Sequence, residues 1–267
     1  MKVLFIGATG LVGKHAVAIL KNKFEITPAA IDGGEVAGLS VQQIDIVKWD
    51  EIESAIKNGA PDGGKFDAVV YCATADYHVK KQTKEDLRLY FENCIEVNAR
   101  GAYHVFEAAW RAGVSRVVHI GSMMEYLGQP SYKYIGVGTP DRPNDVYAAS
   151  KVFGEQVGRS YAFRQPDSGQ SMKVLCLRLA QPSVEDEPQT LRWIHSKESC
   201  PWAADVRDIA SAIECCLTTD LQYGVYPVVS LADDTRIAPA LYAELGYKPQ
   251  WKYDFVEGKG VDISRAA

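Results

Sequence analysis

A tyrosine and a lysine lie four positions apart in the segment Tyr147-Ala148-Ala149-Ser150-Lys151. In a helix this spacing places the phenol and the ammonium group on one face, one turn apart. A nearby positive charge favours the phenolate, so we expect the pKa of Tyr147 to be lowered. Tyr147 could then remove the proton of a hydroxyl group as a general base, with Lys151 supporting it.

Three glycines follow an apolar amino-terminal run, in the segment Gly7-Ala8-Thr9-Gly10-Leu11-Val12-Gly13. Between a first strand and a first helix, glycines let the backbone turn tightly and approach a pyrophosphate. The N–H groups at the helix amino terminus can then bind that pyrophosphate. The spacing is G-x-x-G-x-x-G rather than the commoner G-x-G-x-x-G. We predict a dinucleotide-binding loop here.

Asp32 ends the second apolar run, about 20 residues after the glycine loop. A carboxylate at this place can accept hydrogen bonds from an adenosine ribose. It would also repel the 2′-phosphate of NADP. We therefore expect NAD as cofactor, with NADP less favoured.

Composition excludes several other classes of protein. The chain has 267 residues, of which 47% are hydrophobic and 24% charged, as in an ordinary globular protein. Its net charge of -5 argues against a nucleic-acid partner, and no apolar run is long enough to span a membrane. The cysteines form no C-x-x-C pair and the histidines lack metal-ligand spacing, so we predict no metal site. Without a signal-peptide pattern, we expect a cytoplasmic protein.

Short apolar runs alternate with amphipathic stretches, which indicates βαβ units and a parallel sheet. Several runs are apolar at consecutive positions, as expected for strands covered by helices on both faces. The predicted strands are 2–6, 25–31, 39–44, 67–72, 116–120, 173–177 and 226–229. The predicted helices are 11–21, 49–57, 84–112, 147–163 and 205–217, of which the stretch 84–112 is either one bent helix or two helices that meet between Val97 and Ala99.

These elements predict an α/β fold of the Rossmann type, with a doubly wound parallel sheet. We expect residues 1–180 to form the dinucleotide-binding core. Residues 181–267 would form a small substrate-binding cap that is interleaved with the core and does not fold independently. The segment 128–144 is rich in Gly, Pro and Tyr and is predicted to be a long functional loop.

The glycine loop and the Y-x-x-x-K pair together resemble the extended, NAD-dependent epimerase/dehydratase branch of the short-chain dehydrogenase/reductase superfamily. Asp45-Ile46 is similar to a pair near the adenine in that branch. Cys72-Ala73-Thr74-Ala75 occupies the place of its H-x-A-A segment beside the cofactor, and the run from Glu96 to Ala109 is similar to its N-V-x-G-T-x-N-L-L-E-A-A helix. The resemblance covers most of the chain.

The resemblance implies a set of residues around NAD. Tyr147 is implied as the base, Lys151 as the residue that holds the nicotinamide ribose, and Asn98 as a support of the site backbone. The implied cofactor-binding residues are Gly7, Thr9, Gly10, Leu11, Val12, Gly13, Asp32, Asp45, Ile46, Ala73, Thr74, Ala75, Asn98, Tyr147 and Lys151.

One departure concerns the family's catalytic serine or threonine, which lies in a pattern like S-S/T-x-x-V-Y-G. Here the stretch reads Gly121-Ser122-Met123-Met124-Glu125-Tyr126-Leu127-Gly128, so alignment on Gly128 places Met123 in that slot. A thioether cannot donate a hydrogen bond to a substrate oxygen. Adjacent residues at a strand end also tend to point in opposite directions. We nevertheless predict Ser122 as the catalytic serine.

The implied reaction is the NAD-dependent oxidation of a secondary or anomeric hydroxyl in a small sugar or sugar acid. The short cap leaves little surface for a nucleotide sugar, and in size the chain resembles the compact uronate dehydrogenases. Arg178, Arg192 and Lys197 could hold a substrate carboxylate. A sugar-nucleotide epimerase or dehydratase is one alternative. An NAD(P)-binding sensor or partner-binding module with weak or no turnover, motivated by Met123, is another.

Two predicted helices, 98–111 and 147–163, carry further apolar positions. In related proteins these elements pair across a dimer as a four-helix bundle, so we expect a homodimer. The apolar positions are Ala102, Val105, Phe106, Ala109, Val152, Val157 and Tyr161.

Overall fold

The structure, a computed structural model, describes residues 1–75, 83–129, 135–136, 138–165, 169–184, 203–230, 237–254 and 259–262. Its centre is an eight-stranded sheet in the order β10-β7-β6-β5-β1-β2-β4-β3. Every neighbouring pair is parallel except β3 and β4. The strands are β1 (Lys2–Ile6), β2 (Glu25–Ala30), β3 (Gly34–Val36), β4 (Leu39–Gln43), β5 (Ala68–Tyr71), β6 (Arg116–Ser122), β7 (Lys173–Leu179) and β10 (Tyr223–Val228).

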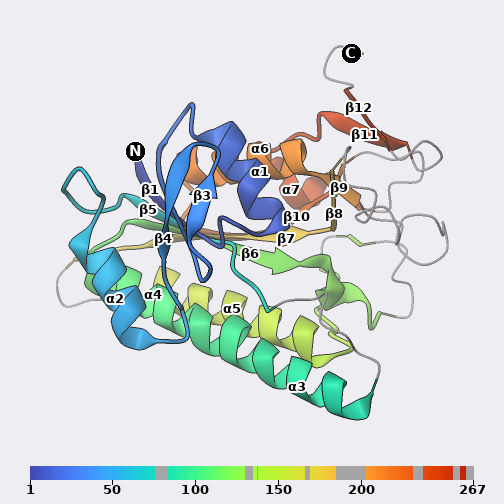
Figure 1. Cartoon of the computed structure of the whole chain (residues 1–267). Coiled ribbons are helices and arrows are strands. Elements are labelled where there is room, and N and C mark those ends of the chain that lie inside the picture. Colours follow the sequence, from blue (N-terminus) through green and yellow to red (C-terminus); the bar gives the residue numbers. More distant parts are fainter. Residues whose placement is uncertain are drawn as a thin grey trace.

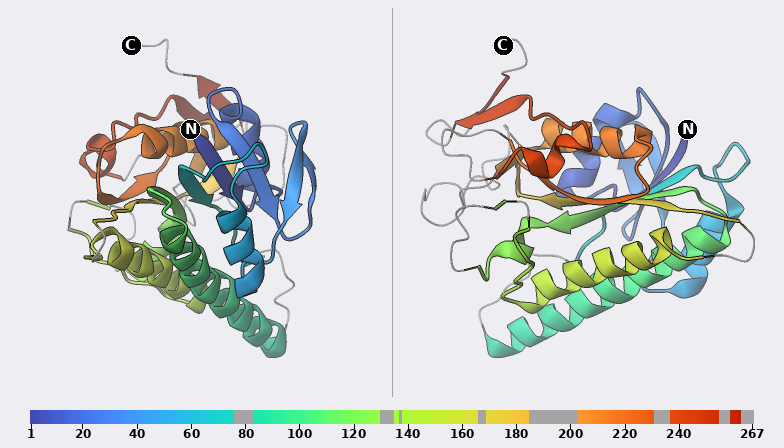
Figure 2. Two further views of the ribbon diagram at one scale, coloured as in Figure 1. Left: turned by 90° about the vertical axis from the view of Figure 1, so that its left-hand side faces the viewer. Right: turned by 180° about the vertical axis from the view of Figure 1, so that it is seen from behind.

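Helices cover both faces of this sheet (Figures 1 and 2). One face carries α1 (Leu11–Leu20) and α6 (Val206–Thr218), which pack against each other. The other face carries α2 (Trp49–Asn58), α4 (Gly101–Arg111) and α5 (Val146–Ala162). The predicted helix 84–112 is a continuous rod in which α3 (Lys84–Cys94) joins α4 through a π-helical segment, η1 (Ile95–Arg100).

The consecutive apolar residues of the strands are explained by these two layers. Val3 and Phe5 of β1 are buried in the core that includes α1 and α6, whereas Leu4 and Ile6 are buried in the core that includes α2 and α4. Burial of each such side chain contributes about 1.5–3 kcal/mol before entropic costs. A strand between two helical layers therefore has no polar face.

The remaining elements gather at the end of the sheet toward which β6 and β7 run (Figure 1). They are β8 (Gln181–Ser183), η2 (Met123–Tyr126), β9 (Ala203–Asp205), α7 (Ala240–Ala243), β11 (Trp251–Asp254) and β12 (Lys259–Asp262). α6 and β10 also follow residue 180, yet β10 pairs with β7 in the main sheet and α6 packs on α1. The predicted division at residue 180 therefore does not coincide with the end of the sheet.

The prediction of a doubly wound α/β fold is confirmed by the sheet order and by the helices on both faces. Sequence patterning missed β3, β8, β9, β11 and β12, which have three or four residues each. Alternation cannot be recognised over so short a span. Among the described residues, no helix has the length and apolar character needed to cross a membrane.

Candidate active site

The three glycines of the loop after β1 have different surroundings. Gly7 has a φ of +88°, and a Cβ added there would lie 2.5 Å from the backbone nitrogen of Ala73. A Cβ at Gly13 would lie 2.1 Å from the Gly7 carbonyl oxygen. At Gly10 the nearest atom would be 3.5 Å away, an ordinary contact. Packing within the chain thus requires Gly7 and Gly13, whereas Gly10 leaves open space.

That space lies at the start of α1, whose N-cap Gly10 makes no side-chain capping hydrogen bond. The amino terminus of a helix offers N–H donors and a positive dipole end to an anion. The loop also lies between β1 and β5, where the chain connections leave for opposite faces of the sheet. Such a switch point is where dinucleotides bind in open α/β sheets. The residues present therefore fit the pyrophosphate of NAD.

Asp32 lies beyond the end of β2, close to the same loop. The Thr9 hydroxyl donates a hydrogen bond to Asp32 Oδ1 at 2.7 Å. The carboxylate is exposed and is oriented by a residue of the glycine loop itself. This is the place at which an adenosine ribose would meet it.

Other predicted cofactor residues have clear local roles. Asp45 Oδ1 accepts a hydrogen bond from the Val47 N–H at 3.0 Å, which shapes the approach to α2. Ile46 is buried, and a Cβ at Gly101 would lie 2.7 Å from its Cδ1 atom. Their predicted proximity to the adenine remains a prediction. Leu11 and Val12, in the first turn of α1, are half-buried. Ala73, just after β5, is half-buried as well.

The Tyr147 phenol lies near the hydroxyls of Thr74 and Ser122, and both act to lower its pKa. Asp145 caps α5 by accepting a hydrogen bond from the Ala148 N–H at 2.8 Å, and so fixes the helix start that carries the phenol. Thr74 follows β5 and Ser122 ends β6. The structure thus brings together three predicted site residues from three elements.

The predicted lowering of the Tyr147 pKa is wrong for this structure. Burial raises the pKa of Tyr147 to about 12, although the hydrogen bonds from Thr74 and Ser122 oppose the rise. The Lys151 ammonium donates to the Ile120 carbonyl at 3.2 Å, and burial lowers its pKa to about 8. Desolvation therefore acts on both groups and outweighs the expected benefit of their spacing.

The side chains of Ser122 and Met123 point in different directions at the end of β6. Ser122 begins the 3-10 turn η2, where its hydroxyl accepts a hydrogen bond from the Met124 N–H at 3.2 Å. Met123 is 2% exposed and belongs to the core on the α1 and α6 face. The two side chains diverge as expected, but Ser122 is the one that meets Tyr147. Met123 therefore gives no reason to expect weak turnover.

Asn98 lies in the π-helical segment η1 and is 1% exposed. Its Oδ1 accepts hydrogen bonds from the Ala75 N–H at 2.9 Å and from the Thr74 hydroxyl at 3.1 Å. Its Nδ2 donates to Ser150 Oγ at 3.0 Å. Single π-helical turns occur frequently at functional sites. Asn98 thus links the segment after β5 to α5.

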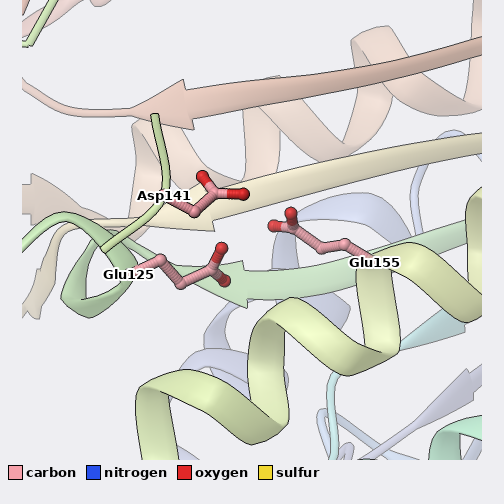
Figure 3. Close-up of side chains that lie close together, drawn as sticks. All are labelled: Glu125, Asp141 and Glu155. Atoms are coloured by element: carbon pink, nitrogen blue, oxygen red, sulfur yellow. The ribbon is translucent and has the colours of Figure 1, made fainter. Parts of the chain in front are cut away.

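Next to Ser122 lies a group of carboxylates that sequence reasoning missed. Glu125, Asp141 and Glu155 converge in Figure 3, with oxygens within 4.8 Å of one another. The Arg178 guanidinium donates to both oxygens of Glu155 at 2.9 and 2.6 Å, and pairs with Asp141 at 2.6 Å and Glu125 at 2.9 Å. The arginine supplies the positive charge that a metal ion would otherwise provide.

The prediction that Arg178 could hold a substrate carboxylate is therefore wrong, because three carboxylates of the chain already surround its guanidinium. The other two candidates, Arg192 and Lys197, lie outside the described residues. One signal for the group was present in the sequence. Glu155 follows Lys151 by four positions and so continues the helix face of Tyr147 and Lys151.

Burial and the neighbouring Glu155 raise the pKa of Glu125 to about 9, so Glu125 holds a proton at neutral pH. Its Oε1 accepts a hydrogen bond from the Ser122 N–H at 3.3 Å. Its backbone carbonyl accepts a hydrogen bond from the Arg142 N–H at 2.8 Å. The buried ion-pair group thereby connects the Ser122 turn to the end of the predicted 128–144 loop.

Comparison with known proteins gives a family match. Residues 3–190 match the NAD dependent epimerase/dehydratase family. An L-arabinose 1-dehydrogenase (NAD(P)(+)) of Haloferax volcanii is 30% identical over 93% of this chain and 96% of that protein. A uronate dehydrogenase of Pseudomonas putida is 27% identical over 74% of this chain and 73% of that protein.

Solved structures share the fold. A mutant uronate dehydrogenase from Agrobacterium tumefaciens complexed with NAD has a TM-score of 0.73 and 22% identity, and the match covers 94% of this chain and 85% of that one. A UDP-galactose 4-epimerase has a TM-score of 0.69 and 18% identity, with 93% of each chain covered. Because that epimerase chain has nearly the same length, length alone does not separate nucleotide-sugar enzymes from sugar dehydrogenases.

The predicted use of NAD and the predicted oxidoreductase chemistry of the extended short-chain type are confirmed by these matches. The glycine loop and the Y-x-x-x-K helix both lie within the matched residues, as do most strands of the central sheet. The chain belongs to the NAD-dependent epimerase/dehydratase family.

Proposed function

We propose that the protein oxidises the anomeric hydroxyl of a small free sugar or sugar acid with NAD. The observation that carries the proposal is the position of the Tyr147 phenol, near the Thr74 and Ser122 hydroxyls and one helical turn from Lys151. Thr74 directly follows Ala73, whose backbone nitrogen touches the glycine loop at Gly7. This arrangement supports Tyr147 as a base beside the segment that would bind the dinucleotide.

In this proposal Tyr147 takes the proton of the substrate hydroxyl, and Ser122 donates a hydrogen bond to the same substrate oxygen. When bound, NAD would supply the acceptor for the hydride that leaves the substrate carbon. Lys151 favours the phenolate while its ammonium carries a charge. The glycine loop would hold the pyrophosphate, and Asp32 would accept a hydrogen bond from the adenosine ribose.

The substrate class is supported by the relatives, since an arabinose 1-dehydrogenase matches along 93% of this chain. Uronate dehydrogenases match over a smaller part. Because Arg178 is engaged by three carboxylates, the proposal assigns it no contact with a substrate carboxylate. A neutral aldose has no carboxylate to bind, so the residues that we assign are sufficient for such a substrate.

The test is NADH formation by the purified protein with three kinds of substrate: L-arabinose, a free hexuronate and UDP-glucose. We expect the absorbance of the reduced cofactor to rise with a free sugar or free uronate, and NADPH to form more slowly from NADP than NADH forms from NAD. Activity with none of the free sugars would refute the proposal. Turnover of UDP-sugars alone would instead support the epimerase or dehydratase alternative.

We also propose a homodimer formed through α4 and α5, in which most of the predicted apolar positions take no part. Ala102, Val105, Phe106, Ala109 and Tyr161 are buried in the core of their own subunit, so they do not face a partner. Ile95, Tyr103 and Phe153 are 46–52% exposed on the same rod and on α5. A monomer mass in light scattering at micromolar concentration would contradict this proposal.

The described cysteines are free thiols, which supports a reducing, cytoplasmic location. Fractionation of cells that produce the protein at its natural level would test that location. Recovery in a secreted or periplasmic fraction would contradict it.

A further inference from the structure

Three strand ends at one edge of the sheet carry predicted cofactor residues in a fixed order. β1 ends at the glycine loop, β2 is followed by Asp32, and β4 is followed by the segment Asp45–Ile46. The Ile44 N–H donates to the Ala30 carbonyl at 2.9 Å, so the start of this segment is tied to β2. With the pyrophosphate at the loop and the ribose at Asp32, the adenine would lie next, over Asp45–Ile46.

The first residue of this segment is held by the chain that follows it. The Lys48 N–H donates to the Asp45 carbonyl at 3.0 Å, and the Asp45 N–H donates to Glu51 Oε2 at 2.9 Å. These bonds fix Asp45, but they do not include the Ile46 carbonyl. Within the described ranges of the chain, one hydrogen-bond donor meets that carbonyl, and this donor belongs to α4.

The donor is His104, whose Nδ1 lies 3.0 Å from the Ile46 carbonyl oxygen. A carbonyl oxygen only accepts, so Nδ1 carries the proton in this bond. Ile46 is 6% exposed, and water is therefore a poor substitute for the donor. A buried carbonyl without a partner costs free energy, so loss of the imidazole would favour a rotation of the Ile46 peptide group.

The imidazole is itself held in place by its surroundings. The Trp49 ring, at the start of α2, meets it edge to face with 5.6 Å between the ring centroids. The Arg111 guanidinium lies 4.9 Å from the centre of the Trp49 ring. α2 and α4 pack against each other, and Gly101 of α4 leaves room for Ile46, since a Cβ there would lie 2.7 Å from Ile46 Cδ1. His104 therefore reaches the segment after β4 from a well-packed framework.

We propose that His104 is a positioning residue for the adenosine end of NAD, because it fixes the Ile46 carbonyl and thereby the backbone over which the adenine would lie. His104 itself does not touch the cofactor in this role. The inference goes beyond the proposed function, since it concerns cofactor binding and holds for any sugar substrate. The sequence pattern indicated no role for this histidine.

The test compares two side chains of nearly the same shape. His104→Asn keeps an N–H donor at the δ position, whereas His104→Leu has none. In the full chain we expect His104→Leu to bind NADH, measured by fluorescence titration, about fivefold more weakly, and ADP-ribose, measured by calorimetry, more weakly by the same factor. His104→Asn should bind both within about twofold of the unchanged protein. Asn is a poorer helix former than Leu, so tighter binding by His104→Asn cannot come from a more stable helix.

Three results would overturn the proposal: unchanged affinities of His104→Leu, equal losses in His104→Leu and His104→Asn, or a loss for NADH that ADP-ribose does not share. His104→Ala, which also lacks the donor, gives the same comparison if His104→Leu does not fold. The titrations contain no sugar, so their outcome is separate from the proposed function. Failure of every free sugar to reduce NAD would refute that function and would leave the role of His104 in place.

Discussion

The glycine loop and the surroundings of Tyr147 lie at the same edge of the sheet, but they are built differently. The loop is made of backbone within seven residues, and its shape depends on Gly7 and Gly13. Tyr147 lies near the side chains of Thr74 and Ser122, which belong to other parts of the chain. A local motif specifies the first site, whereas the second requires the whole fold to be in place.

The electrostatics of the two regions differ as well. Asp32 at the cofactor end is exposed and is oriented by one hydroxyl. Around Tyr147 the ionisable groups Lys151, Glu125 and Arg178 are buried. Desolvation therefore determines protonation at the catalytic end, and it has little influence on the exposed cofactor end.

Tyr147→Phe is expected to have the largest effect, because it removes the proposed base from the side-chain site and leaves the backbone site intact. We expect kcat to fall by about 10³-fold while NADH binding is retained. Steady-state assays and fluorescence titration measure the two. Tyr103→Phe, on the exposed side of α4, serves as the control and should be fully active. Equal activity of Tyr147→Phe would show that the proposed base is wrong.

Arg178→Met tests whether the catalytic end depends on distant side chains. The change leaves the buried Glu155 carboxylate without its cation and the protonated Glu125 without its guanidinium neighbour, so we expect a loss of about 3–5 kcal/mol in the free energy of unfolding, measured with urea. Arg164→Met is the matched control, because Arg164 is exposed and pairs with Glu107 at 3.4 Å. It should cost less than about 1 kcal/mol. Similar losses of unfolding free energy in the two variants would contradict a special contribution of the buried Arg178 ion pairs to stability.

Gly10→Ala tests the backbone site. The added methyl group would touch only the Gly7 carbonyl at 3.5 Å, so we expect an unchanged Tm. It occupies the space that we assign to the pyrophosphate, and NADH affinity should fall about tenfold, or about 1.4 kcal/mol. Gly13→Ala should instead fail to fold, since its Cβ would lie 2.1 Å from a backbone oxygen. Normal NADH binding by Gly10→Ala would place the pyrophosphate elsewhere.

Glu125→Gln sharpens the electrostatic contrast. The pKa of Glu125 is raised from 4.5 to about 9 in the folded protein. The stability that this proton contributes is complete below the unfolded pKa and is lost as pH rises toward the folded one. Relative to Glu125→Gln, the unchanged protein should lose up to about 1.4 kcal/mol per pH unit across that window. Urea unfolding at several pH values measures this, with exposed Glu25→Gln as the control. Parallel pH dependences for the protein and Glu125→Gln would contradict a protonated Glu125.

The same contrast explains how far the sequence could be interpreted. Strand β1, the glycine loop and the Tyr147–Lys151 helix are local patterns, and the structure has each at its predicted place. Arg178 was misjudged because its partners Glu125 and Asp141 are remote in the chain, and no spacing shows that they converge. The pKa of Tyr147 was misjudged because its burial depends on tertiary packing. The predicted roles of Asp32, Asp45 and Asn98 at the cofactor remain predictions.

The π-helical segment between α3 and α4 has a consequence for insertions and deletions. Each residue of an α-helix turns the chain by about 100°, so deleting one residue within Ile95–Arg100 would rotate α3 by that angle relative to α4. The deletion would turn the π-helical segment into a regular α-helix, which is more stable. It would also turn Asn98 away from Thr74 and Ser150. Variants shortened by one residue in this segment should therefore tend to be well folded, yet poor in turnover. Length variation in this rod is thus a means of separating folding from activity.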